Sequence, residues 1–591
     1  MCGFFGSFSP EGKIDNNVKN KISLVHRGPD SHKIFCDQYF DGDFFRLDII
    51  GGKAANQPMM SYDKNLVMFF NGEIYNYLEL AKEYQISYQN GDSRVAIELF
   101  AKKGVQIVKK FNGMFSIALY NKREKTLYLV RDRLGTKPLY YTKKNNIIYF
   151  ASEIKALPIV KNVNYDVVEN YLNLGDYPVI KTFFKNIYNV PPSNIIRVKK
   201  KSFDKLKYFD LKDEVSKHKS KFSQEKFEYL LKNAIMIRQR SDKKINFHLS
   251  GGIDSTALLI YTKDNWSSKY NLNTSSFSYS GYKEDEYKFI SRISKTIGVE
   301  NQKITLYPDE VPELAKKLQY YQDEPYGGLA SVAEYKLNIE ERKKGKIVSF
   351  EGMGGDEILG GYNSHSLLAL NEMIKKNKST NIIKNLKSYL GIINNKDRLN
   401  KTKKLLMAGF YANTDLSDFR KSNKFENTDL KINWFKKIMF HDLIKSKIPR
   451  TLRFRDRISS ACSRELRFPF LDHNFLTYAL SSPIEYKFNF GLPKYPLREI
   501  VKRYFKEDFK FNKRSVSSPQ TNWIQGPLKD WTIDNLNSLK AKNLIDVKYI
   551  VHGEKMIDNK INNSFFIWQL INLNLFFENT TLQNNLINDK R

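Results

Sequence analysis

The sequence predicts a sheet-rich α+β domain followed by an α/β domain with a parallel sheet and a helical C-terminal part. Its 591 residues exceed what one core usually accommodates, so we expect two domains. Roughly the first 160 residues contain short apolar or alternating segments between turns, a pattern typical of sheets. From about residue 222 strands alternate with helices, which indicates a parallel sheet, and beyond about residue 365 the chain reads as mostly helical.

The predicted strands of the first part are apolar segments with clear boundaries. They are NLVMFFNGEIYN at 65–76, MFSIALYNKREKTLYLVRD at 114–132 and NIIYFASE at 146–153. Asn-Gly pairs and charged turns separate them, as in antiparallel sheets. A connecting zone follows, with PPSNIIRVKKK at 191–201 and a charged stretch at 210–221.

The composition favours a cytoplasmic protein without a membrane span. There are 97 basic and 64 acidic residues, a net charge of +33, but the basic residues are spread along the chain and form no arm. A solvated basic surface therefore explains the charge better than nucleic-acid binding, and we expect no nucleic-acid partner. No apolar stretch reaches eighteen residues, no signal peptide is evident, and three cysteines are too few for a disulfide framework.

A glycine-rich loop in KINFHLSGGIDSTALLIY (244–261) predicts a phosphate site. An alternating strand runs into Ser250, Gly251 and Gly252, after which Asp254 and Ser255 open an apolar helix. Such a turn directs unpaired backbone N–H groups and a helix N-terminus at one point, which favours an anion. Hydroxyls could add donors, and Asp254 could hold Mg²⁺ on the phosphate. The loop lacks the GK[ST] ending of a Walker motif.

A second loop, KIVSFEGMGGDEILGGY (346–362), has the same design. A short apolar strand ends in a glycine-rich turn that carries Asp356 and Glu357. Because ligands lie beyond the carboxyl ends of parallel strands, the two loops could face one nucleotide from neighbouring strands. The two loops together predict a nucleotide site with carboxylates for a metal.

The cysteine in MCGFFG predicts a nucleophile. If Met1 is removed, Cys2 carries a free α-amine with a reference pKa of about 7.7–8.0, close to a useful general base. The thiol is then a nucleophile with its base on the same residue. Asn71 and Gly72, at the end of a predicted strand, could stabilise an oxyanion.

Three further side chains predict the substrate of this nucleophile. Arg46 can pair with a carboxylate through two hydrogen bonds, and Glu73 and Asp92 can bind an ammonium group. An amino acid with an amide side chain satisfies all of these groups, and glutamine is such a molecule.

These motifs together resemble the glutamine-hydrolysing asparagine synthetases over nearly the whole chain. The matching motifs of the first domain are MCGFFG, HRGPD (26–30), RLDII (46–50), NGEIYN (71–76) and RDRLGTKPLYY (131–141). Those of the second are SGGIDS (250–255), GGDE plus GGY (354–362), DRISSACSRELR (456–467), RFPFLD (467–472), KYPLRE (494–499) and SSPQTNW (517–523). The resemblance implies a class II glutamine amidotransferase domain at 1–212, with a four-layer αββα nucleophile fold. An ATP-pyrophosphatase-type synthetase domain would occupy 213–591.

The resemblance also implies a reaction. Cys2 would release ammonia from glutamine held by Arg46, Asn71, Gly72, Glu73 and Asp92, and the ammonia would pass through an internal tunnel. MgATP would activate aspartate as β-aspartyl-AMP, and the products would be asparagine, AMP, pyrophosphate and glutamate. The second site would contain Leu249, Ser250, Gly251, Gly252, Asp254, Ser255, Tyr279, Glu351 and Gly352 for ATP, Asp254 and Asp356 for Mg²⁺, and Lys494 for catalysis. The family often forms homodimers, although the sequence itself does not give the oligomeric state.

The second loop departs from the family pattern SGEGSDE. Met353 stands where the family has a glutamate important for adenylate formation, and Glu351 replaces a serine two residues earlier. A thioether can neither carry charge nor act as a base. Two interpretations stay open: Glu351 or another acid substitutes and aspartate is the acceptor, or the enzyme amidates another carboxylate, such as a uronic acid in a polysaccharide.

Overall fold

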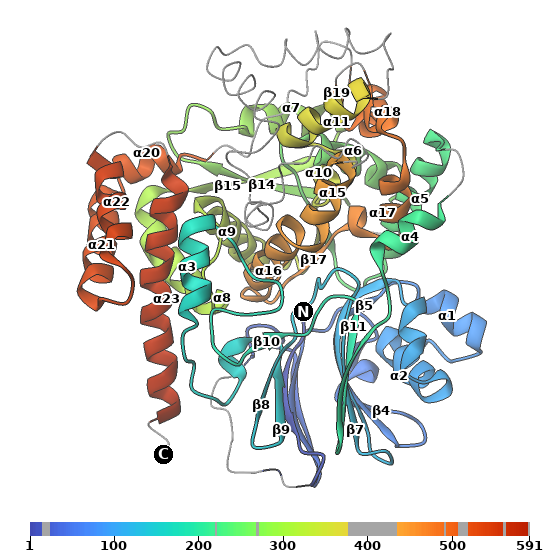
Figure 1. Cartoon of the computed structure of the whole chain (residues 1–591). Coiled ribbons are helices and arrows are strands. Elements are labelled where there is room, and N and C mark those ends of the chain that lie inside the picture. The colour runs from blue at the N-terminus through green and yellow to red at the C-terminus, as the bar shows by residue number, and fades with distance from the viewer. Residues whose placement is uncertain are drawn as a thin grey trace.

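The computed structural model describes residues 1–12, 14, 24–218, 222–266, 271–375, 434–489, 492–505, 518–558 and 563–588. Within these ranges, the N-terminal part contains two antiparallel sheets and the C-terminal part contains a parallel sheet among helices (Figure 1). The predicted fold class is therefore confirmed.

Each N-terminal sheet has six strands among the described residues, all antiparallel to their neighbours. The first runs in the order β10 (Tyr188–Asn189), β8 (Tyr140–Lys144), β9 (Ile147–Ala151), β1 (Gly3–Phe8), β3 (Phe40–Arg46) and β2 (Ser31–Cys36). The second runs β12 (Ser202–Lys207), β11 (Asn194–Lys199), β7 (Thr126–Arg131), β6 (Gly113–Asn121), β5 (Leu66–Ile74) and β4 (Met59–Met60).

Both faces of β5 are buried, which explains its unbroken apolar sequence. Val67 and Phe69 face the first sheet, where Phe69 lies 5.2 Å from Phe40 between ring centroids. Met68 and Phe70 instead share a core with helices α1 (Tyr77–Tyr84) and α2 (Gly91–Lys103). Strand β5 therefore packs into two cores at once, and this packing fixes the position of its C-terminal residues.

The outer face of the first sheet packs against helices rather than solvent. Phe45 and Tyr149 share a core cluster with Tyr171 of α3 (Tyr165–Leu174) and with Trp568 of α23 (Ser564–Asn588). The fourth layer of the αββα arrangement therefore comes from α3 together with helices of the C-terminal part (Figure 1).

The parallel sheet places the two glycine-rich loops side by side. Its strand order is β15 (Glu300–Leu306), β14 (Asn273–Tyr279), β13 (Ile245–His248), β16 (Val348–Phe350) and β17 (Glu465–Arg467), with every neighbouring pair parallel. The loops leave the carboxyl ends of β13 and β16, which are adjacent. This is the position expected of a ligand site in an α/β sheet.

Helices make up most of the remaining C-terminal part. They are α4 (Leu211–Lys217), α5 (Gln224–Arg238), α6 (Ile253–Asp264), α7 (Tyr287–Ile297), α8 (Val311–Gln322), α9 (Leu329–Lys343), α10 (Gly355–Leu359), α11 (Asn363–Lys375), α15 (Trp434–Ile444), α16 (Lys447–Ser460), α17 (His473–Ser481), α18 (Ile484–Lys487), α19 (Tyr495–Lys502), α20 (Gln520–Gln525), α21 (Lys529–Lys542), α22 (Val547–Asp558) and α23. A short hairpin of β18 (Phe488–Asn489) and β19 (Leu492–Pro493) precedes α19. Among the described helices, none combines the length and apolar character that crossing a bilayer requires.

A buried ion network joins the N-terminal part to α16. Arg27 pairs with Glu153 at 2.9 Å and with Asp456 of α16 at 3.0 Å. Arg457, the next residue of α16, also reaches Glu153 at 2.9 Å. All four side chains are almost completely buried, so the pairs have no access to bulk water. The two parts are therefore held in one relative orientation.

We expect Phe69→Ala to lower the free energy of unfolding by about 3–5 kcal/mol, because it empties a fully buried ring position between the sheets. Denaturant unfolding of the full chain, followed by tryptophan fluorescence and circular dichroism, measures the change. The control is Ile34→Ala on β2, a side chain that is 61% exposed, with an expected effect within about 0.5 kcal/mol. Equal effects of the two changes would contradict the assignment of Phe69 to the core.

Candidate active sites

A cavity at the N-terminal end of the chain brings together most of the residues predicted to hold glutamine. Its lining includes Cys2, Arg46, Gly72, Glu73 and Asp92. They come from the residue before β1, the end of β3, the end of β5 and the first turn of α2. Residues far apart in the sequence thus surround one space next to the predicted nucleophile.

Met1 shares this cavity with Cys2. It is 2% exposed, and the Lys137 ammonium contacts its sulfur. Burial lowers the pKa of the Met1 amine to about 5. The Cys2 thiol donates to the Leu47 carbonyl at 3.8 Å, and burial raises its pKa. This amine belongs to Met1; removal of Met1 would place the free amine on Cys2 itself, next to the thiol.

Asn71 and Gly72 have the features of an oxyanion site. Asn71 is fully buried, and neither polar atom of its carboxamide has a hydrogen-bond partner among the described residues. Gly72 has a φ of +140°, and an added Cβ would lie 2.0 Å from the Met114 carbonyl oxygen. Only glycine fits there. Gly72 lines the cavity, and Asn71 precedes it in β5. The side-chain NH₂ group of Asn71 is therefore available to donate a hydrogen bond.

The remaining polar groups suit a zwitterion. Arg46 is held by Asp48 at 2.8 Å and by the side-chain oxygen of Asn56 at 3.1 Å, which fixes its guanidinium at the cavity wall. Burial raises the pKa of Asp92 to about 6. Burial and the nearby Glu465 raise the pKa of Glu73 well above its usual value. One guanidinium and two carboxylates match a ligand with one carboxylate and one ammonium group.

Glu465, which the sequence analysis missed, also lines the cavity although it belongs to the C-terminal part. It begins β17 and accepts from Arg467 Nε at 2.7 Å, while Arg467 lies 3.7 Å from Glu73. The cavity beside Cys2 is therefore completed by a residue of the parallel sheet. The charged residues of Glu-Leu-Arg gave no signal in the sequence, because only the structure shows that this strand is buried.

The serine hydroxyls of the first loop close the loop itself. Ser255 Oγ accepts from the Ser250 amide at 3.2 Å and donates to the Ser250 carbonyl at 2.9 Å, and the two hydroxyl oxygens lie 2.9 Å apart. Gly251 and Gly252 form the exposed turn between them. These hydroxyls shape the turn before α6, which leaves the backbone N–H groups as the anion donors.

Lys494 joins the two loops. Its ammonium lies 2.5 Å from Asp254 of the first loop and 2.7 Å from Asp356 of the second. Burial alone lowers the pKa of Lys494, but the two carboxylates outweigh it and the net shift is upward. An added Cβ on Gly355 would lie 2.6 Å from Asp254 Cγ, and one on Gly361 would lie 1.8 Å from Asp356 Oδ1. A side chain at Gly355 or Gly361 would therefore displace the charged side chains that form this site.

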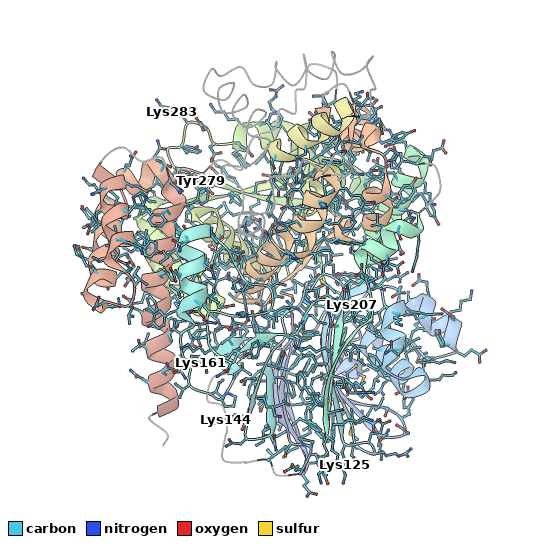
Figure 2. All side chains as sticks on the ribbon, viewed as in Figure 1. Lys125, Lys144, Lys161, Lys207, Tyr279 and Lys283 are labelled. Carbon is cyan, nitrogen blue, oxygen red and sulfur yellow. The ribbon has the colours of Figure 1, made fainter. Side chains whose placement is uncertain are left out.

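The predicted adenosine residues lie at the carboxyl ends of three adjacent strands. Leu249 follows β13, Tyr279 ends β14, and Glu351 and Gly352 follow β16. An added Cβ on Gly352 would lie 2.9 Å from the Ser255 amide nitrogen, so the two loops touch. Figure 2 shows Tyr279 in the upper half of the molecule, away from the two antiparallel sheets.

Met353 and Glu351 have different surroundings. The Met353 side chain packs against the apolar core of the parallel-sheet part. Glu351 instead pairs with Arg455 of α16 at 3.0 Å, and burial raises its pKa to about 8. A carboxyl group is thus present beside the nucleotide loops, two residues before Met353.

Asp254 and Asp356 fit a magnesium ion that arrives with a nucleotide. Among the described residues, no group of three or more His, Cys, Asp or Glu side chains gathers as a metal site. The two aspartates do converge on one cation, the Lys494 ammonium. Mg²⁺ commonly uses one or two carboxylates together with phosphate oxygens, so this pair is sufficient. Arg498, on α19, donates to the Pro493 carbonyl at 2.9 Å behind Lys494.

Comparison with known proteins covers both parts. A family model described as "Glutamine amidotransferase domain" matches residues 1–209, and one described as "Asparagine synthase" matches residues 226–578. Asparagine synthetase [glutamine-hydrolyzing] 1 of Bacillus subtilis is 26% identical over 97% of this chain and 95% of its own length. Putative asparagine synthetase [glutamine-hydrolyzing] 2 of Methanocaldococcus jannaschii is 31% identical over 62% of this chain and 76% of its own length.

A relative with a different name also spans most of the chain: Amidase chry2 of Gibberella zeae is 24% identical over 90% of this chain and 89% of its own length. The predicted enzyme class, an ATP-dependent amidotransferase ligase, agrees with both matching models. The chain therefore belongs to the asparagine synthase family, with a glutamine amidotransferase domain ahead of the synthase domain.

Proposed function

We propose that the chain makes asparagine from aspartate, with ammonia released from glutamine and with MgATP as the activating substrate. The observation that carries this proposal is that one chain holds both a cavity lined by Cys2, Arg46 and Asp92 and two glycine-rich loops joined by Lys494. We assign the glutaminase domain to 1–212 and the synthetase domain to 213–591. We further propose a cytoplasmic homodimer; the unpaired state of all three cysteines fits a reducing compartment.

In the proposed first half-reaction, the Cys2 thiolate attacks the side-chain amide of glutamine. Once Met1 is removed, the Cys2 amine takes the thiol proton and returns it to the leaving ammonia. Asn71 and the Gly72 amide stabilise the oxyanion of the tetrahedral intermediate. Arg46 holds the glutamine carboxylate, and Glu73 with Asp92 holds its ammonium. Water then hydrolyses the thioester to glutamate.

In the proposed second half-reaction, the acceptor carboxylate attacks the α-phosphorus of ATP and pyrophosphate leaves. The backbone N–H groups of Ser250–Ser255 bind the pyrophosphate end, and Lys494 stabilises the negative charge that grows there. Asp254 and Asp356 would hold Mg²⁺, which neutralises phosphate charge when bound. Leu249, Tyr279, Glu351 and Gly352 would line the adenosine. Ammonia from Cys2 then displaces AMP and forms the amide.

A second candidate function has the same glutamine- and ATP-dependent reaction but a different carboxylate acceptor. Met353 packs into the core and cannot act as the family's glutamate, so the acceptor site differs from the usual one. A carboxylate other than aspartate, such as a uronic acid, would then be amidated. The similarity to a relative named as an amidase agrees with a family whose members differ in their substrates.

We expect Cys2→Ala to abolish glutamine hydrolysis, because it removes the only thiol that lines the cavity. Ammonia added directly should still support pyrophosphate release. Coupled assays of glutamate and pyrophosphate measure both activities, and mass spectrometry tests whether the active chain begins at Cys2. The control is Cys36→Ala, an exposed cysteine on β2, which should behave as the unchanged enzyme. Full glutaminase activity in the Cys2 variant would refute the nucleophile assignment.

We expect aspartate to stimulate pyrophosphate release with an equal amount of asparagine, and Lys494→Ala to reduce that rate at least about 100-fold. Its glutaminase rate should stay normal, because Cys2 lies in the other part. Lys502→Ala, an exposed change on the same helix α19, is the control. Glutamine hydrolysis without aspartate-dependent pyrophosphate would contradict asparagine synthesis and favour the second candidate.

We expect glutamine to bind the Cys2→Ala variant more weakly as the pH falls through about 6. Burial raises the pKa of Asp92 to about 6 and also raises that of Glu73, so acidification protonates the groups that hold the ammonium. Each pH unit below the pKa of one required carboxylate should raise the Kd up to about tenfold. Isothermal titration calorimetry measures this. In the Cys2→Ala background, Asp92→Asn should bind glutamine more weakly at pH 8, where both carboxyl groups would otherwise be available; an unchanged Kd at pH 8 would refute the role of Asp92.

A further inference from the structure

Strand β17 of the C-terminal part supplies a charged pair to the wall of the cavity beside Cys2. Glu465 lines the cavity, and its carboxylate accepts from Arg467 Nε at 2.7 Å. Neither residue takes part in the mechanism above. Both are at most 1% exposed, so the pair is enclosed in protein. Because desolvation of such a pair costs about as much as its attraction returns, stability alone does not explain it.

Further contacts fix the guanidinium of Arg467. Its Nη1 atom donates to the backbone carbonyls of Arg238 and Arg240, at 2.6 Å each. The ring of Tyr75, the residue after β5, lies between two guanidinium groups, with Arg238 at 4.5 Å and Arg467 at 5.4 Å from the ring centroid. Stacking on an aromatic ring holds the planar guanidinium in place. Arg467 therefore has one defined position next to the end of β5.

The remaining nitrogen of Arg467 faces Glu73. Arg467 Nη2 lies 3.7 Å from Glu73 Oε2, and neither atom has a hydrogen-bond partner among the described residues. This distance is within the range of an ion pair but too long for a hydrogen bond. Glu73 itself lines the cavity, and we propose above that it holds the ammonium group of glutamine. A fixed positive charge thus lies beside a carboxyl group that would bind the substrate.

Charges of opposite sign act on Glu73 from both parts of the chain. The titratable and charged groups that face it include Asp92 of α2, Cys2, Lys137, Tyr75, Tyr77, and Glu465 and Arg467 of β17. Burial is the largest influence and raises the pKa of Glu73 well above its usual value. The carboxylates of Glu465 and Asp92 also raise this pKa, whereas the cation of Arg467 lowers it. Two residues of one short strand therefore act on Glu73 in opposite directions.

We infer that Glu465 and Arg467 are positioning residues for glutamine, through which the C-terminal part sets the orientation and the charge of Glu73. Arg467 attracts the Glu73 carboxylate and favours its charged form, which is the form that binds an ammonium group. Glu465 opposes this effect and also holds the Arg467 side chain. Glutamine binding in the N-terminal part therefore depends on a strand of the other part. The inference rests on the proposed glutaminase function and adds two residues that act through Glu73.

The test is glutamine binding to the full chain in the Cys2→Ala background, measured by isothermal titration calorimetry between about pH 5 and 9. Binding weakens below the pH at which Glu73 takes up a proton. We expect Glu465→Gln to move that pH down by about one unit, because a like charge is removed. Arg467→Gln should move it up by about as much, because an opposite charge is removed. Arg467→Lys keeps the positive charge and should restore most of the original pH profile.

Shifts in opposite directions separate this effect from misfolding, because a misfolded variant can only lose binding. The matched control is Arg197→Gln on β11, which removes an arginine from a surface ion pair and should leave the profile unchanged. If Glu465→Gln and Arg467→Gln both kept the original profile, or both moved it in the same direction, the inference would be overturned and glutamine binding would still support the proposed function. Absence of glutamine binding at every pH in the Cys2→Ala chain would overturn the proposed function and the inference with it.

Discussion

The buried pairs of Arg27 and Glu153 with Asp456 and Arg457 are the interaction on which the two-part arrangement depends. Loss of one partner of such a pair leaves an uncompensated buried charge, at a cost of about 3–5 kcal/mol. The two parts consequently have one favourable way to dock. That docking brings Glu465, eight residues after Arg457, to the wall of the glutamine cavity. A cavity at one end of the chain is therefore completed only when α16 is in place.

Strand β17 links the two candidate sites physically. Arg467 lies 3.7 Å from Glu73, and Glu465 lines the cavity beside Cys2. The backbone carbonyl of Arg467 accepts from the Glu351 amide at 3.0 Å, beside the nucleotide loops. A three-residue strand thus contacts one site through its side chains and the other through its backbone. A displacement of β17 would therefore move residues at both sites.

The sequence was sufficient to predict those parts of the candidate sites that depend on local backbone geometry. The strand-turn-helix at 244–261 was predicted because its motif fixes its own backbone shape. The residues that line the cavity beside Cys2 were predicted from their side-chain chemistry and from the resemblance to a family. The roles of Ser250 and Ser255 differ in detail, since their hydroxyls close the turn instead of facing outward. The place of Glu465 beside Cys2 could not be predicted. It arises from contacts between residues separated by more than 100 positions, and a charged residue in a strand does not reveal which distant residues it meets.

The burial of Met1 constrains the order of events during biosynthesis. Its side chain is enclosed with Lys137 in the folded chain, so a peptidase cannot reach the bond to Cys2 after the two parts have docked. If a free Cys2 amine is needed, the methionine must be cleaved while the N-terminus is still outside the fold. N-terminal domains fold first during translation, at about 5–20 residues per second, so the opportunity lasts less than roughly two minutes. A chain that escapes trimming in that interval would keep the Met1 side chain in the cavity beside Cys2.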